Sequence, residues 1–136
     1  MAGEPTVRWI VNAGGDLRVA GRGPEPVVLQ TDQPSAAGVA VLELEDASLA
    51  SSRNPAAEPG RPGEPAVGAH LDGRSRRRAG HAGFVSVVAQ DCAVADALTK
   101  VVLVLGAAAT PVLRRYGATA FLQGPDGAWQ RLCEAA

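Results

Sequence analysis

Residues 84–106 read FVSVVAQDCAVADALTKVVLVLG and contain the two clearest secondary-structure signals of the chain. Phe84 and the valines that follow it are typical of a strand. Asp91 then stands where a helix N-cap belongs. Apolar residues recur after it at helical spacing, at positions 94, 97, 98, 101, 102 and 105, and Gly106 is placed to end the helix. The stretch therefore predicts a strand followed by a helix that buries one apolar stripe.

Strand-like segments lie on both sides of this unit, separated by turn-forming residues. They are residues 8–13, 17–20, 26–30, 38–44 and 47–51 before it, and 118–123 and 128–132 after it. Residues 110–116 form a second, shorter helical segment with Pro111 in its first turn. The pattern predicts one domain over residues 1–136 of the α+β class, with a mostly antiparallel sheet and two helices packed on one face.

Residues 52–82 have a different composition, with four prolines in the first half and the run RSRRR at 74–78. They show neither helical nor strand periodicity. Their apolar surface is too small to offset the entropy of ordering the chain. We therefore expect one long irregular loop. Its arginines either hold a phosphate-bearing partner or form a solvated stretch of that loop.

The overall composition narrows the classes of partner. A net charge of -1 gives no strong field to attract nucleic acid or a membrane surface. The longest apolar run, Val101–Ala109, is too short to cross a membrane. Residues 1–6 show no leader sequence, so we expect a cytoplasmic protein. The two cysteines, Cys92 and Cys133, form no CxxC pair and specify neither a zinc site nor a disulfide framework.

Three segments, in this order, carry a resemblance to a known family. Residues 11–18 read VNAGGDLR, residues 83–89 read GFVSVVA, and residues 95–98 read ADAL and run on to Gly106. They are similar to the N-x-G-G-D turn, the following strand and the A-D-A-L-x-T helix of FAD:protein FMN transferases. Between them, residues 39–52 resemble the strand pair that leads to the A-T-S-G turn of that family. The chain thus resembles the C-terminal half of a flavin transferase.

The resemblance implies a function and a set of site residues. The family transfers FMN from FAD to a threonine of a target protein with the help of Mg²⁺. By resemblance, Gly14, Gly15 and Asp16 contact the flavin nucleotide, Asp96 and Thr99 bind the metal ion, and His70 is the catalytic base. The residues alone leave other readings open. The glycines also suit a plain hairpin turn, and His70 also suits an exposed loop, with His81 as another candidate base. Asp96 also suits an i, i+4 ion pair with Lys100, and Lys100 could instead take the place of the cation and neutralise phosphate directly.

Several positions depart from the family pattern. The threonine expected four residues after Asp96 is replaced by Lys100, and Thr99 lies one residue early. The S-G turn reads SSR at 51–53, and the H-x-x-D-P-x-T-G loop is reduced to HLDG at 70–73. The long N-terminal part that completes the FAD pocket in the family is expected to be missing.

Two functional hypotheses follow. The first is a flavin transferase that is impaired alone and needs a second chain, or another copy of itself, to complete the site. The second is a non-catalytic module that binds flavin or another protein. Lys100 separates the two hypotheses, because an ammonium beside Asp96 repels a divalent cation.

Overall fold

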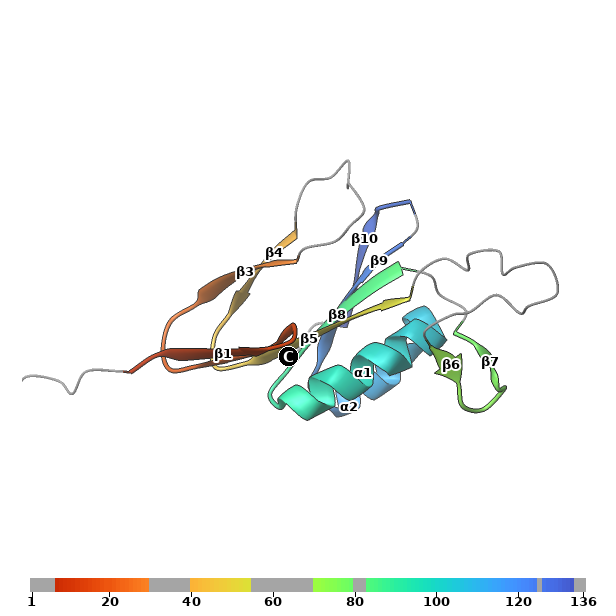
Figure 1. The fold of residues 1–136 in the computed structure, drawn as a ribbon, viewed down its shortest axis with the longest axis horizontal. Helices are drawn as coiled ribbons and strands as arrows, with labels where there is room; N and C mark the ends of the chain where they lie inside the picture. The colour runs from red at the N-terminus through yellow and green to blue at the C-terminus, as the bar shows by residue number, and fades with distance from the viewer. Residues whose placement is uncertain (1–6, 30–39, 55–69, 80–82, 125, 134–136) are drawn as a thin grey trace, which may run out of the picture.

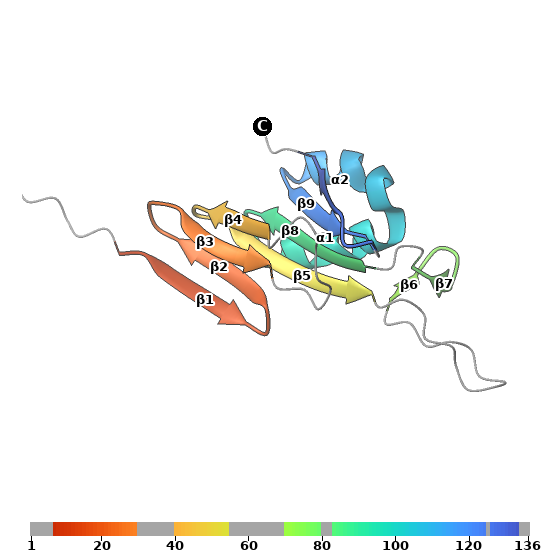
Figure 2. The same ribbon diagram turned by 90° about the horizontal axis from the view of Figure 1, so that it is seen from above.

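The fold is built on one antiparallel sheet of six strands, seen from two directions in Figures 1 and 2. The computed structural model describes residues 7–29, 40–54, 70–79, 83–124 and 126–133. The sheet order is β1–β2–β5–β8–β9–β10, and every neighbouring pair is antiparallel. These strands are β1 (Trp9–Ala13), β2 (Asp16–Ala20), β5 (Ser48–Asn54), β8 (Gly83–Ala89), β9 (Thr119–Gln123) and β10 (Trp129–Leu132). The predicted α+β class with a mostly antiparallel sheet is confirmed.

A single long helix, α1 (Cys92–Leu105), covers one face of this sheet and packs against β5 and β8 (Figure 1). The Asp91 carboxylate accepts hydrogen bonds from the backbone N–H groups of Ala93 and Val94. It therefore satisfies two of the donors that a helix leaves unpaired at its start. The predicted N-cap and helix are confirmed.

The buried stripe of α1 differs from the predicted one. The residues that α1 buries are Ala95, Leu98, Thr99, Val102 and Leu103. Val94, Val101 and Leu105 are only partly buried, and Ala97 is exposed. Thr99 is therefore on the buried face of α1, whereas Asp96 and Lys100 are partly exposed. The small side chains at 95 and 99 point into the sheet, where larger side chains would hold the helix further away.

The expected pair of helices on one face is also corrected, because one helix does most of the covering. α1 is followed without a loop by the 3-10 turn η1 (Gly106–Ala109) and by α2 (Thr110–Arg115), which has only six residues. Gly106 leaves α-helical geometry with φ 55°, but the three alanines after it keep the chain helical. Length and composition alone suggest a membrane span for Cys92–Arg115, with a mean hydropathy of 1.8. In the fold, however, α1 lies on the sheet, and Leu98 and Val102 are buried in the core between the helix and the sheet.

The opposite face of the sheet carries a separate hairpin, β3 (Glu25–Leu29) paired with β4 (Ala40–Leu44) (Figure 1). Its inward residues join the sheet in a second core. This core consists of Leu17, Val19, Leu29, Leu44 and Leu49. Consecutive residues of a strand point to opposite faces, so β5 contributes Leu49 to this core and Ala50 to the core beneath α1.

The expectation of one irregular loop over residues 52–82 is wrong in two places. Residues 52–54 belong to β5, where they pair with β8. Residues 70–79 hold a short hairpin of β6 (Leu71–Asp72) and β7 (Arg77–Arg78). Residues 55–69 and 80–82, with His81, lie outside the described residues.

The turn of the β6–β7 hairpin is organised by Asp72. Its Oδ1 accepts from the Arg74 backbone N–H at 2.9 Å and its Oδ2 accepts from the Ser75 hydroxyl at 3.0 Å. The hydrogen bond from the Arg74 backbone, followed by that from the Arg74 side chain, lowers the pKa of Asp72 from its usual 3.8 to about 2. Local bonds can thus order a stretch that has no apolar periodicity.

This lowered pKa predicts an acid transition of the hairpin. A carboxyl whose pKa is depressed in the folded state stabilises the fold above its unfolded pKa, and that contribution is lost as the pH falls through the folded pKa. The Arg76 amide donates to the Asp72 carbonyl oxygen. We expect its NMR chemical shift to move toward the random-coil value as the pH falls from about 4 to 2. Asp72→Asn keeps an acceptor oxygen but cannot titrate, so the transition should vanish. The same transition in that variant would contradict the assignment.

Candidate functional site

Three consecutive residues at the end of β5, Ser51, Ser52 and Arg53, connect the groups that the sequence singled out. Ser51 and Ser52 point to opposite faces of the sheet because they are neighbours in a strand. The Ser51 hydroxyl lies 2.8 Å from the Ser86 hydroxyl on β8, while the Ser52 hydroxyl lies 2.7 Å from that of Thr99 on α1. The two hydroxyls thus lie on opposite faces of the sheet, and that of Ser52 contacts α1.

The glycine turn lies on the Ser51 side. Gly14 and Gly15 have φ of 67° and 103°, a region where side chains are disfavoured, and the Gly15 N–H donates to Asn12 Oδ1 at 3.0 Å. The cavity next to this turn has a volume of about 370 Å³. Its lining consists of Asn12, Gly14, Gly15, Leu17, Val27, Val28, Leu29, Leu49, Ser51 and Phe84. Apolar side chains supply most of the lining, and Asn12, Ser51 and the backbone of the glycine turn supply polar groups that could orient a bound molecule.

Polar side chains of α1 lie on the Ser52 side. Thr99 is fully buried, and its hydroxyl donates to the Asp96 carbonyl oxygen at 2.7 Å. A hydroxyl has only one proton to donate, so the Ser52 hydroxyl must be the donor to Thr99. Next to this pair, the Lys100 ammonium forms an ion pair with Asp96 Oδ1, and both side chains are 43% exposed.

His70 joins the same segment from the β6–β7 hairpin. Its Nε2 lies 3.0 Å from the Arg53 carbonyl oxygen. A carbonyl only accepts, so Nε2 carries the proton and the lone pair of the neutral ring is on Nδ1. The contact thus leaves Nδ1 as the nitrogen that could accept a proton.

Cys92, the first residue of α1, is partly buried and is surrounded by more negative than positive charge. Burial raises the pKa of the Cys92 thiol above its usual value, and the carboxylates of Asp16, Asp91 and Asp96 raise it further. Asp16, from β2, and Asp96, from α1, thus both act electrostatically on this thiol, and Arg18 acts in the opposite sense. Cys92 is held as a neutral thiol rather than as a reactive thiolate.

Gly14, Gly15, Thr99 and His70 thus lie around β5, but not in one cavity, and Asp16 does not line the cavity beside the glycine turn. Gly14 and Gly15 line the cavity on the hairpin side, whereas Asp96 and Thr99 lie on the α1 side. Asp96 does not line that cavity. Sequence reasoning treated Ser51 and Ser52 only as an altered turn and gave Phe84 no role. The available signal was the alternation of β5, which places adjacent serines on opposite faces.

The oxygen atoms expected to bind Mg²⁺ do not fit that ion in this arrangement. Mg²⁺ needs a near-octahedral set of oxygens, usually from one or two carboxylates together with phosphates and water. The Thr99 hydroxyl is enclosed and already bonded on two sides, and the Asp96 carboxylate is paired with Lys100. Within the described parts of the chain, no three His, Cys, Asp or Glu side chains are grouped as metal ligands. The metal role of Asp96 and Thr99 stays a prediction.

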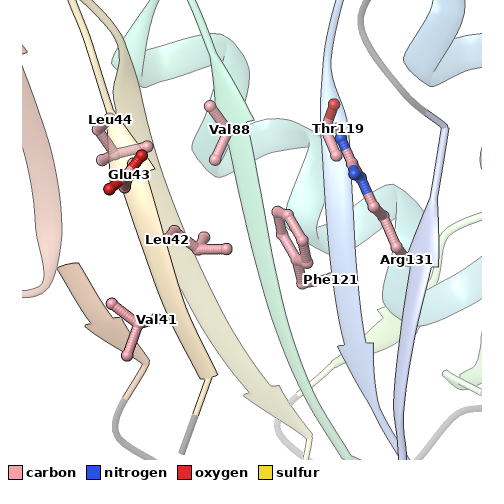
Figure 3. A pocket seen from close by; sticks show the side chains of 8 residues that line it. All are labelled: Val41, Leu42, Glu43, Leu44, Val88, Thr119, Phe121 and Arg131. Atoms are coloured by element: carbon pink, nitrogen blue, oxygen red, sulfur yellow. The ribbon is translucent and has the colours of Figure 1, made fainter. Parts of the chain in front are cut away.

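A second, larger cavity lies between β4 of the β3–β4 hairpin and strands β8, β9 and β10 of the sheet (Figure 3). Its volume is about 820 Å³. It is lined by Val41, Leu42, Glu43, Leu44, Val88, Thr119, Phe121 and Arg131. The Arg131 guanidinium lies 5.9 Å from the centre of the Phe121 ring. None of the predicted site residues lines it. It could not be predicted, because the packing of β4 over the sheet is a long-range feature.

Comparison with known proteins places this geometry in a family. The ApbE family matches residues 3–122, and no curated protein matches the sequence significantly. Two solved structures are similar, each with a TM-score of 0.64 over 92% of this chain. One is the flavinyl transferase ApbE of Pseudomonas stutzeri in its apo form, 19% identical, which supports the fold alone. The other is the ApbE protein of Thermotoga maritima, 25% identical.

The chain corresponds to only part of these proteins, covering 39% of the first and 42% of the second. The matched residues nevertheless include the glycine turn, the Ser51–Arg53 segment, His70 and the polar residues of α1. The chain therefore belongs to the ApbE family.

Proposed function

We propose that this chain binds a flavin nucleotide at the Ser51–Arg53 segment and takes part in the transfer of FMN from FAD to a protein threonine. The observation that carries the proposal is the position of this segment. It joins the glycine-turn cavity through Ser51, the α1 polar residues through Ser52, and His70 through the Arg53 carbonyl. Residues distant in sequence, singled out for one reaction, thus meet at three neighbouring positions.

The chemistry available to these residues suits that transfer. The hydroxyl oxygen of the acceptor threonine would attack the phosphorus of the FMN moiety, the bond from that phosphorus to the oxygen of the AMP phosphate would break, and AMP would leave. The hydroxyl proton would pass to Nδ1 of His70, the nitrogen that carries the lone pair. The glycine turn leaves the backbone open to close approach by the nucleotide. Rate in such a reaction depends mainly on positioning and charge stabilisation.

A non-catalytic flavin-binding module is the second candidate. The ion pair between Asp96 and Lys100 favours it, because it removes the carboxylate expected to assist the reaction. In the first candidate, the rest of the site comes from polypeptide beyond these residues, for example a second chain or another copy of this one. Both candidates require that the chain bind flavin nucleotide.

Titration with FAD, followed by flavin fluorescence, tests that shared requirement. Ser51→Leu should fill the cavity and weaken FAD binding by at least about tenfold. Ser51→Ala is the matched control, because it also removes the bond to Ser86 but adds no volume, and it should bind FAD nearly as the original chain does. Equal binding by both variants would exclude this cavity. Undetectable binding by the original chain would exclude the proposed function.

A further inference from the structure

The α1 side of the site already contains a fixed positive charge. Lys100 is half-exposed on the same helix as Asp96, and its ammonium contacts the carboxylate predicted to bind a metal ion. A divalent ion at Asp96 would lie next to this ammonium, and like charges at such short range repel strongly. The ion would have to displace Lys100 before it could bind.

The neighbouring hydroxyl does not offer the ion a second ligand. Thr99 has no exposed surface, donates to the Asp96 carbonyl oxygen and accepts from Ser52. Turning its oxygen toward an ion outside the helix would break both bonds and open the contact between α1 and β5. Breaking buried hydrogen bonds is costly because the partners are left unsatisfied.

An ammonium can supply the charge that a diphosphate needs. Lysine binds phosphate as a point charge with three N–H donors. Lys100 lies one helical turn after Asp96 and is held beside its carboxylate, at the position where the resemblance implies the cation that faces the diphosphate. We propose that the Lys100 ammonium, rather than a divalent metal ion, neutralises the diphosphate of the bound flavin nucleotide. The proposal rests on the proposed function.

Calorimetric titration of the protein with FAD, in EDTA and then in MgCl₂, tests this directly. The expected dissociation constants agree within about twofold in the two buffers. Lys100→Gln should weaken FAD binding by about tenfold or more, and Lys100→Arg should restore most of it. Riboflavin, which has no phosphate, should bind equally to the original chain and to Lys100→Gln. Arg114→Gln, on α2, removes the same charge elsewhere and should leave FAD binding unchanged.

Asp96→Asn separates the two possible cations most sharply. If Lys100 is the cation, removing its competing carboxylate should leave FAD binding in EDTA intact or make it tighter. If a metal ion is the cation, the same variant should weaken FAD binding in MgCl₂. Binding that requires MgCl₂, or that Lys100→Gln does not weaken, would overturn this inference alone. A loss of riboflavin affinity in Lys100→Gln equal to that of FAD would overturn it by showing a structural role. No FAD binding in either buffer would overturn the proposed function as well.

Discussion

Gly83→Ala is expected to destabilise the domain by about 3 kcal/mol or more. Gly83 has φ 144°, a conformation that costs other residues roughly 1–3 kcal/mol. A Cβ built there would lie 2.2 Å from the Gln123 carbonyl oxygen of β9, and relieving such overpacking adds about 1–3 kcal/mol. The oxygen belongs to the backbone, so β8 and β9 would have to separate at this end. Urea unfolding followed by far-UV circular dichroism measures the loss.

Gly73→Ala is the matched control for this substitution. Gly73 lies in the β6–β7 turn, and no atom lies within 4 Å of a Cβ built at that position. Its replacement should change the free energy of unfolding by no more than about 0.5 kcal/mol. If Gly83→Ala were as stable as the original chain, the close contact between β8 and β9 would be wrong. If both variants lost the same stability, the effect would come from glycine substitution in general.

The strand and helix of residues 84–106 could be predicted because local signals agree there. The valines favour a strand, Asp91 caps the helix, and the apolar residues recur with helical period. The prediction of which face of α1 is buried was wrong, because helical periodicity favours the stripe with the most large apolar side chains. The sheet instead accepts the small side chains of Ala95 and Thr99, and Thr99 gains a partner in Ser52. Which of two adjacent stripes is buried depends on the surface opposite, which no local pattern specifies.

The β3–β4 hairpin shows the same limit on a larger scale. Its two strands were predicted, but not that they would leave the main sheet and cover its second face. The β6–β7 hairpin was missed for a different reason. The carboxylate of Asp72 organises its turn, and bonds of this kind leave no periodic trace in the sequence.

The candidate site was predictable as a set of residues but not as an arrangement. Resemblance pointed to Gly14–Asp16, His70 and Asp96, and the structure brings Gly14 and Gly15 next to Ser51 and His70 next to Arg53. It could not show that Ser51 and Ser52 divide them between two faces of the sheet, nor that the Thr99 hydroxyl is enclosed. Those facts depend on strand register and on the contact between α1 and β5.

The 136-residue chain alone is expected to transfer FMN at least about 10²–10³-fold more slowly than a full-length flavinyl transferase. Transfer requires the phosphorus, the acceptor hydroxyl and the base to be held in line. In this chain the cavity at the glycine turn and the polar residues of α1 lie on opposite faces of the sheet, and nothing among the described residues encloses both. The two similar structures are more than twice as long. A site closed on so few sides also admits water, which weakens charge stabilisation.

Incubation with FAD, Mg²⁺ and a threonine-bearing acceptor peptide, followed by mass spectrometry, measures the covalent FMN adduct. The flavinyl transferase of Pseudomonas stutzeri serves as the positive control for the assay. An adduct formed by the isolated chain at a comparable rate, and lost in His70→Ala, would contradict the expected impairment and confirm His70 as the base.

An adduct that appears only in Lys100→Thr would contradict the view that the open site limits the rate. It would instead assign the loss to α1, because threonine restores the oxygen ligand of the family pattern and removes the ammonium that repels a metal ion. The expected result is FAD binding without any adduct in the original chain, and no adduct in either variant. It follows from a site that binds its nucleotide but does not enclose it.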